Sequence, residues 1–211
     1  MHHADNVPAD ILGQVKKCAA VLRSGGIAAY PTDTVYGLGA DVHNYRAVIK
    51  IFTAKQRPLS LPLPILIADS SQLGELTADI PPLARTLMAR FWPGGLTIVL
   101  AASPAFNSPA LAGSRKVAVR IPAHAVTLKL IEEFGRPIVG TSANLHGGPL
   151  ALTAAEVRSQ LGTAADFILD GGPCPGGIES TIVDVSGDKP VILRKGAITE
   201  EDLLDSLSKW Q

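Results

Sequence analysis

The chain has 211 residues, and its 19 basic and 19 acidic side chains give a formal net charge of zero at pH 7. This balance excludes a protein whose whole surface attracts nucleic acid or an anionic membrane. Apolar residues make up 46% of the chain and charged residues 18%, with 20 glycines and 16 prolines, which is the composition of a compact, turn-rich globular protein.

Apolar periodicity, interrupted by glycine and proline, predicts helices that alternate with strands. Asn44 and Thr199 stand where helix N-caps are expected, and Thr153 with Glu156 forms a capping box. The predicted helices cover residues 9–24, 44–54, 82–91 and 125–134, a segment that begins at Thr153, and a segment from Thr199 to near Trp210. The predicted strands cover residues 27–30, 64–68, 96–101, 116–121, 137–141, 167–169, 181–185 and 191–194.

This order of elements predicts an α/β fold in a single domain over residues 1–211, because no repeat and no long linker divides the chain. Several strands are separated only by turns, so we expect one mixed sheet flanked by helices. Cys18 and Cys174 form neither a disulfide framework nor a metal motif. Because the chain also lacks a signal peptide and an apolar run of membrane-spanning length, we expect a cytoplasmic protein with no membrane segment.

Four polar stretches interrupt the apolar pattern. Residues 31–39 carry small hydroxyls and glycines, which form either a turn or a close backbone approach to a ligand. Lys55 and Arg57 follow a helix, where they either complement its dipole or bind phosphate through the planar fork of Arg57. The third stretch, residues 140–148, resembles an anion-binding nest. The fourth stretch consists of Ser180-Thr181 and residues 193–196. For Arg194, the alternative to a role in a binding site is a surface ion pair.

No nucleophile stands out. His43, His124 and His146 lie in turn contexts that favour solvated or capping roles, and one carboxylate, Glu179, does not define a metal site. The polar residues therefore indicate positioning and charge neutralisation, which is typical of a nucleotidyl-transfer enzyme.

Taken together, the polar stretches resemble the YrdC-like family over residues 25–196. Each motif is unspecific alone, but six in the family's order are specific. They are Tyr30-Pro31-Thr32-Asp33-Thr34-Val35-Tyr36-Gly37-Leu38-Gly39, Lys55-Gln56-Arg57-Pro58, Pro93-Gly94-Gly95-Leu96-Thr97, Val119-Arg120-Ile121-Pro122, Ser142-Ala143-Asn144 and Ser180-Thr181-Ile182-Val183-Asp184.

The resemblance implies a twisted open α/β sheet with a large, concave, positively charged cavity. It also implies that L-threonine, bicarbonate or CO2, and ATP bound with Mg2+ give L-threonylcarbamoyl-AMP and pyrophosphate. The product would pass to a transferase complex that modifies tRNA, and the reaction itself requires no RNA.

The family pattern also implies roles for individual residues. Those that would bind ATP are Lys55, Arg57, Lys116, Ser142, Asn144, Leu150 and Arg194, and those that would bind threonine are Thr34, Arg120, Gly140 and Ser180. Alternation along residues 116–121 supports one of these roles, because it places Arg120 opposite the core-facing Val119 and so turns its fork towards a substrate carboxylate.

Two departures from the family concern Leu61 and Leu66, where many members have asparagine and histidine. Longer relatives carry a C-terminal domain, so this chain resembles the short, single-domain form. Two alternatives remain open. One is carbamoyl-adenylate chemistry, as in the YrdC-like segment of hydrogenase-maturation proteins. The other is a double-stranded RNA-binding or ribosome-maturation protein, which zero net charge disfavours.

Overall fold

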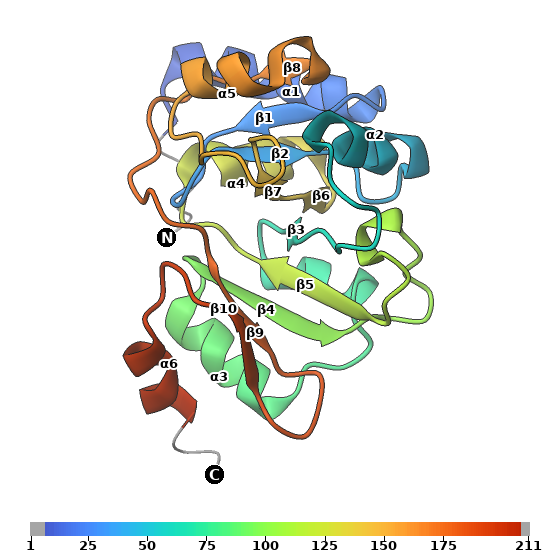
Figure 1. The fold of residues 1–211 in the computed structure, drawn as a ribbon, viewed down its shortest axis with the longest axis vertical. Helices are drawn as coiled ribbons and strands as arrows, with labels where there is room; N and C mark the ends of the chain where they lie inside the picture. The colour runs from blue at the N-terminus through green and yellow to red at the C-terminus, as the bar shows by residue number, and fades with distance from the viewer. Residues whose placement is uncertain (1–6, 208–211) are drawn as a thin grey trace.

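The computed structural model describes residues 7–207, and its helices agree with the periodicity of the sequence (Figure 1). The α-helices are α1 (Ala9–Arg23), α2 (Tyr45–Lys55), α3 (Pro82–Phe91), α4 (Ala125–Phe134), α5 (Ala154–Leu161) and α6 (Glu200–Leu207). The expected caps are present, since the side chain of Asn44 accepts from the backbone N–H of Ala47 and Thr153 forms its capping box with Glu156. The predicted end of the last helix, near Trp210, lies outside the described residues.

Within the described residues, the strands form two mixed sheets, whereas the sequence predicted one. The small sheet has the order β7-β2-β1-β8 and consists of β7 (Thr141–Ser142), β2 (Gly37–Gly39), β1 (Ala28–Tyr30) and β8 (Phe167–Ile168). The large sheet has the order β10-β9-β4-β5-β3-β6 and consists of β10 (Val191–Arg194), β9 (Thr181–Asp184), β4 (Leu96–Ala101), β5 (Lys116–Arg120), β3 (Ile65–Leu66) and β6 (Ile138–Val139).

In the small sheet, β2 and the second residue of β7 fall in stretches that the sequence placed in loops, and the strand predicted over 137–141 divides into β6 of the large sheet and the start of β7. The reason is composition, because glycine and short polar residues have low strand propensity and give no alternating pattern. Tertiary packing overrides that preference here. The ring of buried Tyr30 lies so close to Gly37 that a Cβ at Gly37 would be 2.8 Å from it. A side chain at this position would therefore push the two strands apart.

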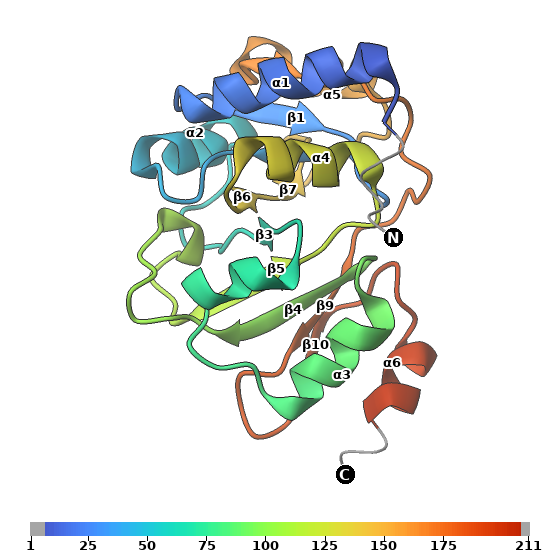
Figure 2. The same ribbon diagram turned by 180° about the vertical axis from the view of Figure 1, so that it is seen from behind.

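Helices cover both faces of the small sheet, with α1 and α4 on one face and α2 and α5 on the other, and one face of the large sheet (Figure 1 and Figure 2). The apolar faces of α1 and α4 pack together and against the small sheet, and α3 covers the back of the large sheet, next to α6. The opposite face of the large sheet is open, with Val191 and Leu193 of β10 more than half exposed. None of the described helices has the length and apolar character needed to span a bilayer.

The two sheets meet where the chain passes from β6 into β7 through Gly140. The N–H of Gly140 donates to the carbonyl of Pro64 (2.8 Å), and the N–H of Val139 donates to the carbonyl of Ala40 (2.9 Å). The hydroxyl of Tyr30 also donates to the carbonyl of Val139 (2.7 Å). These bonds hold the sheets at a fixed distance, and polar residues of both face the space between them.

Candidate active site

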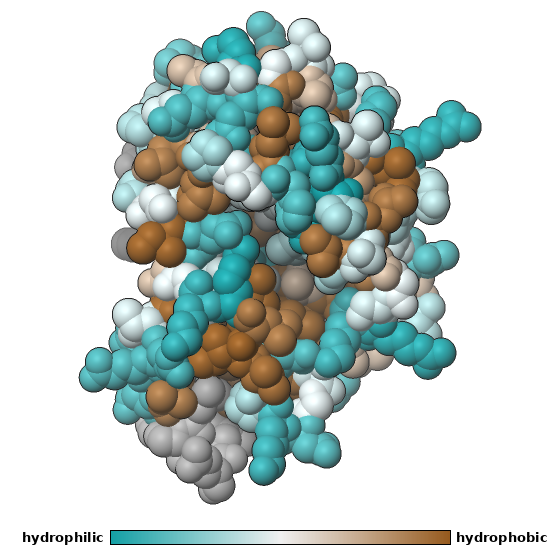
Figure 3. Space-filling model, viewed as in Figure 1, coloured by the Kyte–Doolittle hydropathy of each residue, from teal (hydrophilic) through white to brown (hydrophobic). Residues whose placement is uncertain are grey.

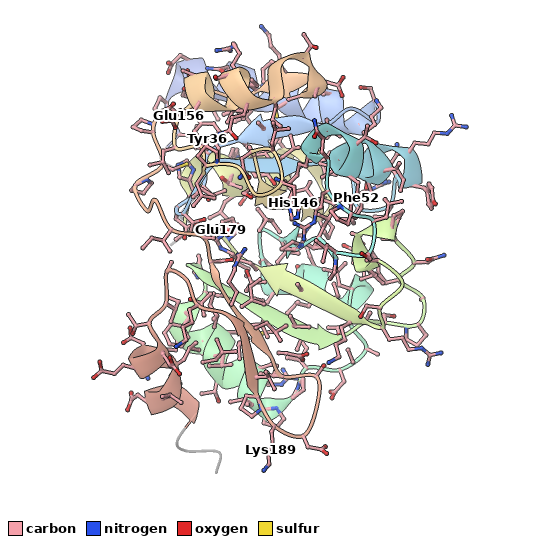
Figure 4. The ribbon with its side chains drawn as sticks, in the orientation of Figure 1. Tyr36, Phe52, His146, Glu156, Glu179 and Lys189 are labelled. Carbon is pink, nitrogen blue, oxygen red and sulfur yellow. The ribbon has the colours of Figure 1, made fainter. Side chains whose placement is uncertain are left out.

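A cavity of about 670 Å³, including its mouth, lies between the two sheets. Figure 3 shows this face of the molecule hollowed at that level, and Figure 4 shows Glu179 beside the same space with Tyr36 on the side of the small sheet. The lining residues are Thr32, Thr34, Val35, Tyr36, Gly37, Arg57, Pro62, Pro64, Leu66, Thr97, Arg120, Gly140, Thr141, Ser142, Glu179, Ser180, Ile182 and Arg194. The lining joins segments that are far apart in the sequence.

Three guanidinium groups line the cavity, from Arg57 after α2, Arg120 at the end of β5 and Arg194 at the end of β10. Burial lowers the pKa of both Arg57 and Arg120, but arginine stays charged in proteins because its ordinary pKa is so high. Among the described residues, the acidic side chain that lines the cavity is Glu179. The lining therefore carries an excess of positive charge and suits a polyanion.

Arg57 is held by the loop that follows it. Its Nε donates to the carbonyl of Leu61 (3.3 Å) and its Nη2 to that of Pro62 (3.0 Å). The preceding residue, Gln56, ends α2 in a left-handed conformation with φ of 51°, which turns the chain sharply before Arg57. The guanidinium keeps donors for an anion, because it has five N–H groups.

Arg194 ties together three strands of the large sheet. Its Nε and Nη2 donate to the carbonyl and the hydroxyl of Ser180 (3.0 and 3.1 Å), and its Nη1 pairs with Glu179 (2.9 Å). The hydroxyl of Ser180 also shares a hydrogen bond with that of Thr97 (2.8 Å). The surface ion pair considered for Arg194 is thus present, but it lies at the cavity wall.

The prediction that Arg120 faces the cavity is confirmed. Its side chain is only 6% exposed. Its Nε donates to the carbonyl of Gly94 (2.8 Å), its Nη1 donates to the hydroxyl of Thr34 (3.0 Å), and its Nη2 forms an ion pair with Asp33. Two residues from the first motif and one from the third therefore fix the direction of one arginine.

Lys55 does not line the cavity. Its side chain is buried, with the residue 1% exposed, and its Nζ donates to the main-chain carbonyls of Ser142 and Asn144 and to the side-chain oxygen of Asn144. Burial, and then the charge of Arg57, lower the pKa of Lys55 to about 8. An ammonium has three N–H groups, so all of them are used within the protein, and Lys55 holds the end of β7, which carries Ser142, and the loop that follows it.

The structure does not bring three other predicted residues into the lining. Lys116 lies at the opposite end of β5 from Arg120, where its Nζ pairs with Asp184 (2.7 Å). Asn144 is buried behind the loop, and its side-chain amide donates to the carbonyl of Gly148 (2.7 Å). Leu150 is half-buried outside the lining.

Two residues that shape the site, Asp33 and Thr97, were not predicted from the sequence. Asp33 belongs to a motif that was singled out, but its place in a turn-like stretch gave no sign of a partner 87 residues away. Thr97 belongs to a strand that was predicted correctly, and its polar side chain in an otherwise apolar strand was the available signal.

The donor set fits a Mg2+ ion that arrives with a nucleotide. No group of three or more metal-ligating side chains occurs among the described residues, so the protein offers no ready-made cage. Mg2+ is commonly held by substrate phosphates and one or two carboxylates, and Glu179 is the carboxylate that lines the cavity.

Comparison with known proteins identifies the fold. The model of a family described as Sua5_yciO_yrdC, "Telomere recombination", matches residues 20–196. The chain belongs to this family. It is 48% identical over 191 residues to the threonylcarbamoyl-AMP synthase of Bacillus subtilis, covering 90% of this chain and 55% of that one. It is 41% identical over 162 residues to the synthase of Alkalilimnicola ehrlichii, covering 77% and 84% of the two chains.

Solved structures of the family agree. The structure of Pyrococcus abyssi Sua5 complexed with L-threonine matches with a TM-score of 0.89 and 42% identity, covering 92% of this chain and 57% of that one. Escherichia coli YciO matches with a TM-score of 0.81 and 25% identity, covering 90% and 93%. The chain thus spans about half the length of the Bacillus and Pyrococcus relatives that it matches. A mixed α/β fold with the Sua5 and YciO architecture is therefore confirmed.

Proposed function

We propose that the cavity forms L-threonylcarbamoyl-AMP and pyrophosphate from L-threonine, bicarbonate or CO2, and ATP. The observation that carries this proposal is the convergence of Arg57, Arg120 and Arg194 on one cavity rich in hydroxyls. The same activity is given in the names of relatives from Bacillus subtilis and Alkalilimnicola ehrlichii. The core of this activity would lie in residues 25–196.

The charges divide the cavity into two regions. In our proposal Arg57 and Arg194 bind the triphosphate, and the loop of Ser142, held by Lys55, approaches the phosphates. Arg120, whose guanidinium contacts Thr34, binds the amino acid through its carboxylate, and Ser180 and Gly140 of the same lining make further contacts with the amino acid. The lining is thus positive where the phosphates would lie. Mg2+ would add neutralisation of phosphate charge when bound, and Glu179 would be the cavity carboxylate that holds it.

The reaction needs alignment rather than a protein nucleophile. The amine of threonine forms a C–N bond with CO2 and releases a proton, which gives a carbamate. A carbamate oxygen then forms a bond with the α-phosphorus of ATP while the bond to pyrophosphate breaks. A cavity that orients two substrates and excludes water is sufficient for both steps. We further propose that the product passes to a tRNA-modifying transferase complex, and the need for ATP favours the cytoplasm.

The test is pyrophosphate release with threonine, bicarbonate and ATP, each omitted in turn. We expect release only when all three are present, no requirement for RNA, and loss of release in Arg57→Ala with the fold intact. Release with carbamoyl phosphate in place of threonine and bicarbonate would instead support carbamoyl-adenylate chemistry. Binding of double-stranded RNA that weakens steeply with salt, without pyrophosphate release, would support the RNA-binding alternative.

A further inference from the structure

Asp33 contacts the guanidinium of Arg120 but does not belong to the set of residues that line the cavity. Its neighbours Thr32 and Thr34 do line the cavity. The carboxylate of Asp33 forms an ion pair with Nη2 of Arg120, and the exposed fractions of the two side chains are 15% and 6%. Asp33 therefore contacts Arg120 without itself lining the cavity.

Counting donors shows what this contact leaves for a ligand. A guanidinium has five N–H groups, one on Nε and two on each terminal nitrogen. In Arg120, Nε donates to Gly94, one N–H of Nη1 to Thr34 and one N–H of Nη2 to Asp33. One N–H therefore remains on each terminal nitrogen, which matches the two oxygens of a carboxylate.

Charge gives Asp33 a second effect on Arg120. Burial lowers the pKa of Arg120, and the charge of Asp33 is the largest influence that opposes burial. A buried cation without a partner is costly, and its side chain moves to find another acceptor. Asp33 thus offsets part of the cost of burying this cation and holds its side chain in place while the cavity has no ligand.

We propose that Asp33 is a positioning residue that fixes Arg120 so that its two remaining N–H groups form a bidentate site for the carboxylate of the amino-acid substrate. This proposal rests on the function proposed above. Asp33 acts through Arg120 and does not itself contact the substrate, so its loss weakens amino-acid binding and leaves nucleotide binding unchanged.

The chain offers a matched control. At the other end of β5, Lys116 pairs with Asp184 (2.7 Å), whose side chain is 11% exposed and lies outside the cavity lining. The change Asp184→Asn therefore removes a carboxylate of similar burial, which lies on β9 and pairs with a cation at the other end of β5. Any general loss of stability should be similar in Asp33→Asn and Asp184→Asn.

The experiment measures pyrophosphate release against threonine and ATP concentration in the parent protein, Asp33→Asn and Asp184→Asn. We expect Asp33→Asn to raise the KM for threonine roughly tenfold or more and to change the KM for ATP less than about twofold. Asp184→Asn should change neither KM by more than about twofold. If Asp33→Asn has the same KM for threonine as the parent protein, the proposal is overturned. If the parent protein itself releases no pyrophosphate in response to threonine, the proposed function is overturned instead.

A double-mutant cycle shows whether Asp33 acts through Arg120. We expect Arg120→Lys and the double variant Arg120→Lys with Asp33→Asn to have the same threonine KM, because the path through the arginine is already lost. Additive effects would overturn the proposal. If Asp33→Asn does not fold, Asp33→Glu decides instead. It keeps the charge but displaces it by one methylene, and we expect a threonine KM raised at least about threefold with an unchanged ATP KM; an unchanged threonine KM overturns the proposal.

Discussion

The ammonium group of Lys55 donates to the main-chain oxygens of both Ser142 and Asn144, and so joins the end of α2 to the loop after β7. Arg57, two residues further on, lines the cavity and is held by carbonyl groups of its own loop. The two cations of this motif therefore have different roles. One supports the wall of the cavity, and the other faces into it.

Replacing each cation should separate these roles. Lys55→Met leaves two buried carbonyl oxygens without their donor, so we expect a loss of roughly 2–4 kcal/mol in the free energy of unfolding. Arg57→Ala should change that free energy by less than about 0.5 kcal/mol and weaken ATP binding roughly tenfold. Denaturant unfolding and calorimetric titration with ATP measure the two quantities. Equal stability of Lys55→Met and the parent would contradict the assignment.

The pKa of Lys55 predicts a pH dependence of stability. Its pKa is lowered from 10.5 to about 8 in the folded protein, so between these values the unfolded chain binds a proton that the folded protein has lost. Since stability rises with pH wherever the unfolded state binds more protons, burial of the ammonium opposes folding fully below pH 8 and ceases to do so above 10.5.

We therefore expect the free energy of unfolding of the parent to rise relative to that of Lys55→Met between pH 8 and 10.5, by about 1.4 kcal/mol for each unit of pKa difference. Denaturant titrations of both proteins across this range measure the difference. A parent that loses stability relative to Lys55→Met over the same range would show that the ammonium is stabilised by its three acceptors more than burial opposes it.

Local patterns predicted the elements and one important direction in the site. Helical spacing and caps placed α2 and α5, and alternation along β5 placed Arg120 opposite the core-facing Val119. Alternation predicts which face of a strand a side chain occupies, but it does not predict where along the strand a ligand binds. Lys116, which shares the face of Arg120, was placed with the ATP ligands by the family resemblance, although it lies at the far end of the strand.

Contacts between distant segments could not be predicted from the sequence. The bond from Lys55 to the side chain of Asn144 joins residues 89 apart, and the ion pair of Asp33 with Arg120 joins residues 87 apart. Both depend on how the two sheets face each other. Strand β2, with its sequence Gly37-Leu38-Gly39, forms only because Tyr30 and its neighbours pack against it, and tertiary packing of this kind leaves no local signal.

Glu179 should compete with ATP for Arg194. Its carboxylate pairs with Nη1 of Arg194 (2.9 Å). Its charge also opposes the lowering of the pKa of Lys55 and Arg57 that burial causes. Glu179→Gln removes this charge, so we expect metal-free ATP to bind several-fold more tightly, because a partly exposed pair contributes about 1 kcal/mol. With excess Mg2+ the gain should shrink or reverse, since Glu179 is the cavity carboxylate available to the metal.

Calorimetry with ATP, in chelator and in Mg2+, measures both effects. Glu200→Gln is the matched control, because Glu200 pairs with Lys195, the neighbour of Arg194, at the exposed surface. It should change neither affinity. Metal-free ATP that binds Glu179→Gln no more tightly than the parent would contradict the competition.

We expect any side chain at Gly140 to clash with the neighbouring side chain of Leu66 and to destabilise the protein. A Cβ at Gly140 would lie 2.3 Å from Cγ of Leu66, and the backbone of Gly140 is fixed by its hydrogen bond to Pro64. Gly140→Ala must therefore displace the side chain of Leu66, which lines the cavity and lies in register with Arg120. We expect a loss of about 1–3 kcal/mol in the free energy of unfolding and weaker amino-acid binding.

The double variant Gly140→Ala with Leu66→Ala should be more stable than the sum of the single effects predicts, because the smaller side chain makes room for the new Cβ. Gly13→Ala in α1 is the control, since a Cβ there meets nothing within 4 Å and should stabilise the helix by roughly 0.5–1 kcal/mol. Denaturant unfolding of the four variants measures the coupling. Strictly additive losses would show that the backbone of Gly140, rather than the side chain of Leu66, yields to the substitution, and that the passage between the two sheets is less rigid than its hydrogen bonds indicate.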